Sequence, residues 1–278
     1  MFTIHEGARE FIIQREGVQF QSYPFSFNEL FQAEDPYQWL MRYTAGRNAL
    51  RIPRDLQKSA WMAPIQSQEI WAAGVTYLRS CNARMEEAEA SGGASLYDRV
   101  YEAARPELFL KATPDRVRGP NQPVRIRSDS ASNVPEPELT LAINSRGKVF
   151  GYTIGNDLTA RTIEGENALY MAQAKVYHGS CAIGPCLVVG EVITRGTMIR
   201  MQVYRDQRIA FQGETTLGQI KRSFEDLASY LFREQYFPFG VYLMTGTGIV
   251  PSGHFTLQHG DYIRIEIDGI GILDNVVE

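Results

Sequence analysis

The sequence predicts an α+β protein that is mainly β, with a small N-terminal domain over residues 1–68 and a larger domain over residues 69–278. Two observations predict this organisation. Up to about residue 65 the chain is rich in Gln, Arg and aromatic side chains, whereas from residue 107 onward β-branched and aromatic residues alternate between Gly, Asn, Asp and Pro. With 44% hydrophobic and 22% charged residues the chain can bury a large core, which excludes a disordered protein.

Helical patterns occur mostly in the first part of the chain. Residues 27–43, "FNELFQAEDPYQWLMRY", predict short helices broken by Pro36, because proline cannot continue a helix. Residues 79–90 consist largely of good helix formers, and a second helix within residues 95–106 is stopped by Pro106.

Strand patterns dominate after residue 107, and a single helix interrupts them. That helix covers residues 223–234, where Ser223 is the expected N-cap and Asp226 stands at the capping-box distance. Alternation and turn residues predict a mainly antiparallel sheet. The segments expected to form strands are residues 107–112, 123–128, 138–144, 147–157, 186–193, 198–214 and 261–269.

Charge and composition narrow the class of partner. The net charge of −4 and the isoelectric point near 5.7 argue against nucleic acid and favour a small molecule. The N-terminus lacks the apolar segment of a secretion signal, and no stretch is apolar enough to span a membrane, so we expect a soluble, cytoplasmic protein. The three cysteines form an odd set without zinc spacing and are expected to be small buried side chains in a reducing compartment.

The stretch "NVPEPEL", residues 133–139, carries two closely spaced glutamates. Because side chains alternate along a strand, Glu136 and Glu138 project to the same side. Pro135 and Pro137 lack the backbone N–H groups that would bond to a neighbouring strand, so the two glutamates are expected at a strand entrance or edge. Such a pair alone also fits a solvated strand face. Under burial, however, two carboxylates this close require a proton or a cation between them.

Two further residues strengthen the cation hypothesis. Asp157 ends another apolar strand, and Lys175 follows it in "AQAKVYHG". Three carboxylates, one divalent cation and one ammonium sum to zero charge, which makes partial burial tolerable. Oxygen ligands favour Mg²⁺, with Mn²⁺ or Ca²⁺ as alternatives, over zinc.

Five ordered motifs lie between about residues 70 and 270: "PELFLKATPDRVRGPNQPVRI", "PEPELTLAI", "GYTIGNDLTAR", "AKVYHGSCAIGPCLV" and "MTGTGIVP". Together they resemble the fumarylacetoacetate hydrolase superfamily. The resemblance implies a mixed β-roll catalytic domain, Mg²⁺ held by Glu136, Glu138 and Asp157, a lysine at Lys175 near the substrate, and a homodimer or homotetramer. It also implies that the turn containing Thr245, Gly246 and Thr247 contacts the carboxylate of a 2-oxo acid substrate.

A local difference separates the subgroups of this superfamily. Members that act on acylpyruvates carry a motif like G-x-N-Y-x-x-H-A-x-E, whose His and Glu activate water. Here the segment "GVTYLRSCNARMEE" keeps Gly74 and Tyr77, has Thr76 in place of Asn and lacks the His. The stretches "VYEAARPELFLKATPDR", "RSDS" and "PEPEL" are most similar to 2-keto-3-deoxy-D-arabinonate dehydratases, in which the glutamate matching Glu107 is an acid/base partner.

The resulting expectation is a Mg²⁺-dependent dehydration of a 2-keto-3-deoxy sugar acid to 2-oxoglutarate semialdehyde. Lys175 is the expected base at C3, with a pKa lowered by the dication, and Glu107 the acid at the C4 hydroxyl, or the two roles are exchanged. Lys111 either contacts the substrate or neutralises the carboxylates. Tyr77, with Arg79 and Arg84, is expected to cover the site.

Two other functions fit the same pattern. One is an acylpyruvate hydrolase, oxaloacetate decarboxylase or tautomerase with the same metal site. The other is a noncatalytic protein that binds a 2-oxo acid. A dinucleotide cofactor is not expected, because "TGTG" at residues 245–248 lacks the third spaced glycine and the following helix.

Overall fold

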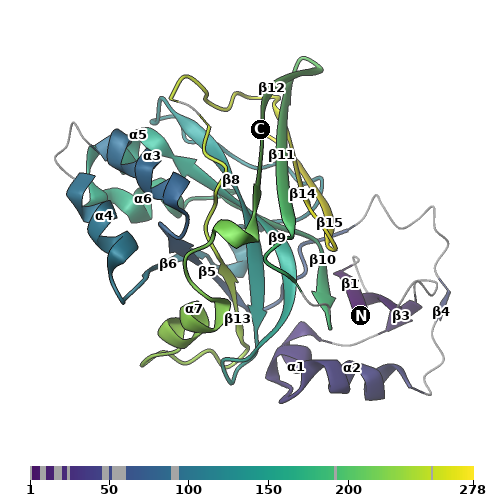
Figure 1. Ribbon diagram of the computed structural model, residues 1–278. Coiled ribbons are helices and arrows are strands. Elements are labelled where there is room, and N and C mark those ends of the chain that lie inside the picture. Colours follow the sequence, from purple (N-terminus) through teal and green to yellow (C-terminus); the bar gives the residue numbers. More distant parts are fainter. Residues whose placement is uncertain are drawn as a thin grey trace.

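A large curled sheet forms the body of the protein, and a four-stranded sheet packs on one of its faces (Figure 1). The computed structural model describes residues 2–6, 11–15, 21–23, 26–45, 50–51, 61–88, 94–190, 193–251 and 253–278. Within these ranges the large sheet has eleven strands: β1 (Phe2–Glu6), β2 (Phe11–Arg15), β3 (Gln21–Tyr23), β4 (Leu50–Arg51), β5 (Glu69–Gly74), β6 (Glu107–Ala112), β7 (Val117–Arg118), β8 (Asn133–Ile143), β9 (Val149–Ala160), β10 (Cys181–Val189) and β13 (Val241–Met244). The small sheet contains β11 (Met198–Arg205), β12 (Arg208–Thr216), β14 (Tyr262–Ile267) and β15 (Gly271–Val276).

The strand order explains how distant parts of the chain meet. The large sheet runs β4-β3-β2-β1-β10-β9-β8-β13-β5-β6, with β7 beside β10, and the small sheet runs β12-β11-β14-β15. Only the β13–β5 and β10–β7 pairs are parallel among the strand pairs described. The predicted α+β, mainly antiparallel architecture is therefore confirmed.

The N-terminal segment continues the large sheet. Strand β1 pairs with β10, so that Phe2 lies opposite Val189. The predicted short helices are confirmed as α1 (Phe27–Gln32) and α2 (Pro36–Thr44), which begins at the proline. Strands β1 to β3 were not predicted. The division at residues 68 and 69 stays a prediction, although both proposed domains contribute to one sheet.

Two hydrophobic cores lie on opposite faces of the large sheet. One fills the space between the two sheets and includes Leu141, Ile154, Met201 and Ile265. The other lies on the opposite face with α1, α2 and β1 and includes Phe31 and other fully buried apolar residues. Strands β8 and β9 are consequently covered on both sides, which explains why every residue of β8 is buried.

Besides α1 and α2, the described residues form the α-helices α3 (Leu78–Ala88), α4 (Ala94–Glu102), α5 (Arg161–Glu166), α6 (Met171–Lys175) and α7 (Phe224–Leu231). Figure 1 shows α3 to α6 gathered at one side of the large sheet, away from α1 and α2. The predictions of α3, α4 and α7 are confirmed, and the Ser223 hydroxyl accepts a hydrogen bond from the Asp226 N–H at 3.0 Å. Residues 89–90 of the first predicted helix lie outside the described residues.

The prediction of a single helix after residue 107 is wrong, because α5 and α6 connect β9 to β10. Both are too short to show a helical period in the sequence. The predicted strand at residues 123–128 is also wrong. Val124 makes one bridge, to Val277, and the N–H groups of Val124 and Arg125 bond to different segments, so no ladder forms.

The other predicted strands are confirmed as β6, β8, β9, β10, the β11–β12 hairpin and β14. Residues 191–192 of the predicted strand at 186–193 lie outside the described residues. All three cysteines are buried and free, as expected. None of the helices in the described ranges has the length and apolarity needed to cross a membrane.

Candidate metal centre and active site

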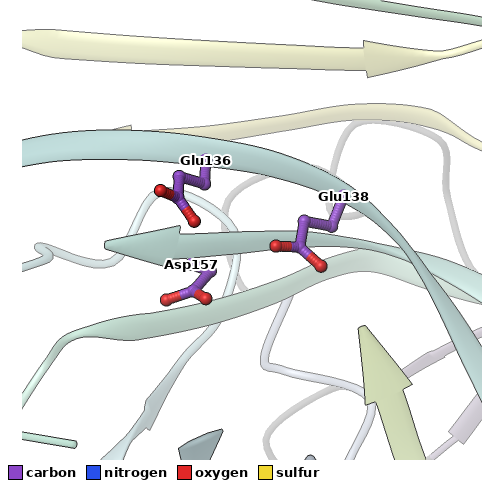
Figure 2. Close-up of side chains that lie close together, drawn as sticks. All are labelled: Glu136, Glu138 and Asp157. Atoms are coloured by element: carbon purple, nitrogen blue, oxygen red, sulfur yellow. The ribbon is translucent and has the colours of Figure 1, made fainter. Parts of the chain in front are cut away.

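Three buried carboxylates converge between two neighbouring strands (Figure 2). Glu136 and Glu138 lie on β8, and Asp157 on β9 is the direct cross-strand partner of Glu136. Each offers a carboxylate oxygen, and these oxygens lie within 4.8 Å of one another. The structure thus brings together the three residues that the sequence predicted as a cluster.

The local strand pairing places this cluster where the sequence indicated. Strand β13 pairs with β8 only at residues 140–143, so residues 133–139 pair with β9 on one side alone. The prolines Pro135 and Pro137 occupy this part of β8, where the missing N–H groups break no second ladder. The predicted position at a strand entrance is confirmed.

Two fully buried lysines neutralise part of the cluster. Lys175, at the end of α6, donates hydrogen bonds to Glu136 Oε2 at 2.6 Å, Asp157 Oδ2 at 3.0 Å and Thr159 Oγ1 at 2.6 Å. Lys111 Nζ lies 2.7 Å from Asp157 Oδ1 and donates to the carbonyls of Leu158 and Lys175. The two ammonium groups therefore contact different oxygens of the Asp157 carboxylate.

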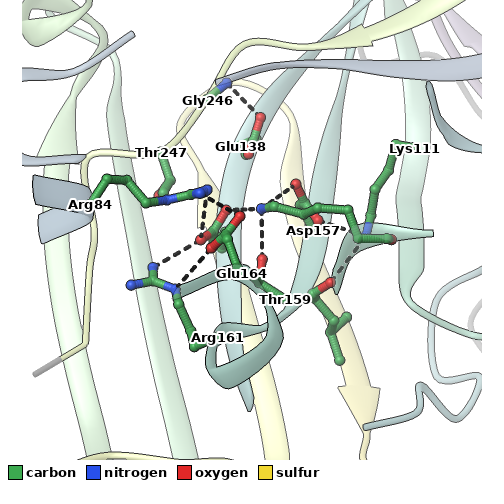
Figure 3. Close-up of polar contacts among 12 residues, drawn as sticks. Arg84, Lys111, Glu138, Asp157, Thr159, Arg161, Glu164, Gly246 and Thr247 are labelled. Carbon is green, nitrogen blue, oxygen red and sulfur yellow. Dashed lines mark hydrogen bonds and ion pairs between the residues drawn. The ribbon is translucent and has the colours of Figure 1, made fainter. Parts of the chain in front are cut away.

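A second layer of charge was not predicted (Figure 3). Arg161 Nη2 donates to Glu136 Oε1 at 2.9 Å, and Arg84 forms an ion pair with Glu164 while its Nη2 lies 4.0 Å from Glu136 Oε1. Arg84 was expected to cover the site from outside, but it is buried within the cluster. Arg79 is exposed.

The sequence carried only a weak signal for this layer. Arg161 and Glu164 are three residues apart in α5, directly after β9. The Arg161 side chain reaches Glu136 on β8, and Glu164 pairs with Arg84. Three-residue spacing places them on one side of a helical turn. Without a prediction of α5, that relation could not be used.

Burial and like charge act most strongly on Glu138. Burial, Asp157 and Glu136 raise the pKa of Glu138 well above its usual range. Its carboxylate accepts a hydrogen bond from the Gly246 N–H at 2.5 Å. Burial alone would also raise the pKa of Glu136, but Lys175, Arg161 and Arg84 together lower it below its usual range. Glu138 is therefore the carboxylate with the least cationic support.

Lys175 experiences opposing effects. Burial lowers its pKa, but Asp157, Glu136 and Glu164 raise it by more, so with these neighbours its pKa lies above the usual range. The expected neutral amine thus depends on a further positive charge near the carboxylates.

The overall charge fits a dication and a monoanionic ligand. Five carboxylates face four cationic side chains, which leaves one negative charge when all are ionised. A divalent ion would change this to one positive charge, which a monoanionic ligand would neutralise. The ligand set of three carboxylates suits Mg²⁺, and His and Cys are absent from the group found among the described residues. The carboxylates are Glu107, Glu136, Glu138, Asp157 and Glu164, and the cations are Arg84, Lys111, Arg161 and Lys175.

The predicted turn at Thr245 to Thr247 lies directly against the cluster. Thr245 Oγ1 donates to the Leu139 carbonyl at 2.9 Å, and the Thr76 hydroxyl donates to the Thr245 carbonyl at 2.6 Å. Gly246 has a φ of +89°, which favours glycine and aims its N–H at Glu138. Thr247 is buried beside it. Hydrogen bonds therefore tie the turn to β8 and to Thr76, beside the carboxylate cluster.

Tyr77 lies under the same turn. It is fully buried, and among the described residues its hydroxyl has no hydrogen-bond partner. Burial and then Glu138 raise its pKa above the usual range. An unpaired buried hydroxyl is costly, so a ligand or water that accepts or donates a hydrogen bond here would be favoured.

A cavity of about 480 Å³ opens beside the cluster and contains Glu107. Burial raises the pKa of the Glu107 carboxyl, and Arg84 only partly opposes this. Arg84 lines the cavity and also lies 4.0 Å from Glu136 Oε1, so it connects the cavity with the carboxylate cluster. The exposed surface of the cavity is mainly apolar. Its lining includes Arg84, Leu96, Tyr97, Val100, Glu107, Glu164 and Met171.

Comparison with known proteins assigns the family. A family model described as "Fumarylacetoacetate (FAA) hydrolase C-terminal" matches residues 69–278. The chain belongs to the fumarylacetoacetate hydrolase family. Among its curated relatives is the probable 2-keto-3-deoxyxylonate dehydratase of Haloferax volcanii, 44% identical over 216 residues, or 77% of this chain and 73% of the relative. Another is the 2-dehydro-3-deoxy-D-arabinonate dehydratase of Saccharolobus solfataricus, 38% identical over 255 residues, or 86% of each chain.

A solved structure extends the comparison to a ligand complex. It is described as 2-keto-3-deoxy-D-arabinonate dehydratase complexed with magnesium and 2,5-dioxopentanoate. It matches with a TM-score of 0.81 and 32% identity, covering 100% of this chain and 98% of that chain. The predicted family and fold are thereby confirmed. Because its dehydratase relatives are 44% and 38% identical to it, this protein is an enzyme and a hydro-lyase. The alternative of a noncatalytic binding protein is therefore excluded.

Glu136→Gln tests the ligand assignment. Removing one of the three charges should weaken Mg²⁺ binding by about 100-fold or more, measured by calorimetry, because three carboxylates supply the protein's share of an oxygen site. Glu166→Gln, an exposed change at the end of α5, is the matched control and should bind Mg²⁺ as the wild type does. Unchanged Mg²⁺ affinity in a folded Glu136→Gln protein would contradict the assignment.

Lys111→Met tests the buried charge balance. Its ammonium pairs with the buried Asp157 carboxylate, so its loss should lower the free energy of unfolding by about 3–5 kcal/mol. Denaturant unfolding measures this, with Lys148→Met at an exposed position as control. A free energy of unfolding equal to that of the control would show that Asp157 does not need Lys111.

Proposed function

We propose that this hydro-lyase dehydrates a 2-keto-3-deoxy sugar acid of the 2-keto-3-deoxy-D-arabinonate type to 2-oxoglutarate semialdehyde in the presence of Mg²⁺. The observation that carries the proposal is the convergence of Glu136, Glu138 and Asp157 beside Lys175, with Glu107 in the adjoining cavity. The names of the relatives support the substrate class. The compound 2,5-dioxopentanoate, present with magnesium in the similar solved structure, is the same molecule as the proposed product.

Glu136, Glu138 and Asp157 would hold the ion, and Mn²⁺ or Ca²⁺ also suits three carboxylates. When bound, a divalent ion supplies positive charge that polarises a 2-oxo group and offsets the carboxylates that favour the ammonium form of Lys175. The remaining chemistry falls to the side chains of the chain itself.

Lys175 is the proposed base. Its Nζ contacts two of the carboxylates directly, so a 2-oxo acid at this cluster would lie within reach of the amine. In its neutral form Lys175 takes the proton from C3 of the substrate. The Thr159 hydroxyl, 2.6 Å away, orients the amine.

Glu107 is the proposed acid. Because burial raises its pKa, the carboxyl keeps its proton closer to neutral pH than an exposed glutamate does. It gives this proton to the departing C4 hydroxyl, and water leaves. A C5 proton then moves to C3, and the resulting enol becomes the aldehyde when C4 gains a proton and the enol hydroxyl loses its own. The net change is loss of one water, and the two side chains can also exchange roles.

The substrate carboxylate is proposed to bind at the turn formed by Thr245, Gly246 and Thr247, with the Tyr77 hydroxyl as a further hydrogen-bond partner. The geometry of Lys111 favours its neutralising role over substrate contact, because Asp157 and two backbone carbonyls already surround its ammonium. The cavity beside Glu107 would take the distal end of the sugar acid. A homodimer or homotetramer and a cytoplasmic location stay predictions.

The hydrolase alternative is less well supported. In the acylpyruvate motif the spacing after Tyr77 places the His at residue 80, which is serine here. A serine cannot act as the base that activates water at neutral pH without a partner base.

Glu107→Gln tests the proposal. With Mg²⁺ present, the wild type should convert 2-keto-3-deoxy-D-arabinonate to an aldehyde that a coupled aldehyde dehydrogenase detects. The variant should lose about 10²–10⁴-fold in kcat, the usual contribution of a general acid, while its Mg²⁺ affinity is retained. Glu86→Gln, exposed on α3, is the control. Absence of aldehyde from the wild type, or release of pyruvate from an acylpyruvate instead, would reject the proposed reaction.

A further inference from the structure

A glycine lies directly beneath the Glu107 carboxylate. Strands β5 and β6 are antiparallel, and their register places Gly74 opposite Glu107. A Cβ atom added to Gly74 would lie 1.9 Å from Glu107 Oε2, 2.6 Å from its Cδ and 3.3 Å from its Cγ. The carboxylate therefore occupies the volume that any other side chain at residue 74 would fill.

The constraint that requires glycine at residue 74 differs from the constraint at other glycines where an added Cβ atom would clash. A Cβ at Gly119 would meet the backbone N of Ala63 at 2.4 Å, so close chain packing explains that position. Gly246 has a positive φ and supports the turn. Gly74 has no positive φ, and the three atoms nearest to its added Cβ all belong to Glu107. Neither backbone conformation nor close chain packing therefore accounts for it.

The consequence of adding a methyl group follows from what must move. The backbone of β5 is held by β13 on one side and by β6 on the other. The Glu107 carboxylate, by contrast, is the end of a flexible side chain that borders the cavity. A methyl group at residue 74 would displace the carboxylate and leave the sheet in place.

We propose that Gly74 is a positioning residue for the dehydration: its lack of a side chain seats the Glu107 carboxylate over β5 and toward the cavity. The inference rests on the proposed role of Glu107. It assigns to Gly74 an effect that is exerted only through Glu107, without contact with the substrate. An alanine at residue 74 should therefore impair the proposed general-acid function of Glu107 in part.

Gly74→Ala should lower kcat by about 10- to 100-fold, since a displacement of about 1 Å is sufficient for such a loss. Mg²⁺ affinity and the melting temperature should stay at their wild-type values. In a Glu107→Ala background the same change should alter kcat by less than about twofold, because the two residues act as one unit. Gly253→Ala, where an added Cβ has no neighbour within 4 Å, is the control and should be neutral.

Two results would overturn the inference: a kcat for Gly74→Ala within about twofold of the wild type, or an equal loss in both backgrounds, which is the additive outcome. A crystal structure of Gly74→Ala gives a readout that does not depend on turnover. A displaced Glu107 carboxylate is expected, and an unmoved carboxylate would refute the steric argument. Failure of the wild type to dehydrate the substrate would reject the proposed function, whereas the crystal structure would still decide the placement of Glu107.

Discussion

The repulsion among three buried carboxylates is the constraint on which the rest of this site depends. Unit charges a few ångströms apart in a protein interior repel each other by several kcal/mol, and burial adds to the cost. Lys111, Lys175 and Arg161 offset this cost at Glu136 and Asp157. At Glu138 the support is a backbone N–H, and its raised pKa marks the place where further positive charge is most favourable.

The fold holds these groups so that they cannot separate. Glu136 and Asp157 are direct partners across β8 and β9, and both strands are covered by hydrophobic cores on their two faces. The turn at Gly246 is tied to β8 and to Thr76, which fixes the donor to Glu138. Repulsion therefore cannot relax by movement of the backbone. A proton or a further cation would relieve it, and for this reason the group is suited to hold a metal ion.

The sequence predicted the parts of this arrangement that follow from strand alternation. Glu136 and Glu138 share a face because they are two residues apart, and the prolines beside them indicated an open strand side. Asp157 could be placed only as the end of another strand, and its pairing with Glu136 comes from the sheet register. Arg161 and Glu164 were missed because α5 is too short to show a helical period, and Arg84 was placed outside because its burial depends on the packing of α3 against α5. The contact between Gly74 and Glu107 likewise depends on register, which one sequence does not show.

A calorimetric titration of the wild type with Mg²⁺, repeated in buffers of different ionisation enthalpy, tests the central claim most directly. Because the pKa of Glu138 is raised, its carboxyl carries a proton before the ion binds at pH values below that raised pKa. The account predicts that Mg²⁺ binding releases protons, that the release per ion grows as the pH is lowered, and that Mg²⁺ affinity falls in parallel. No detectable Mg²⁺ binding, or binding without proton release at every pH tested, would contradict the account.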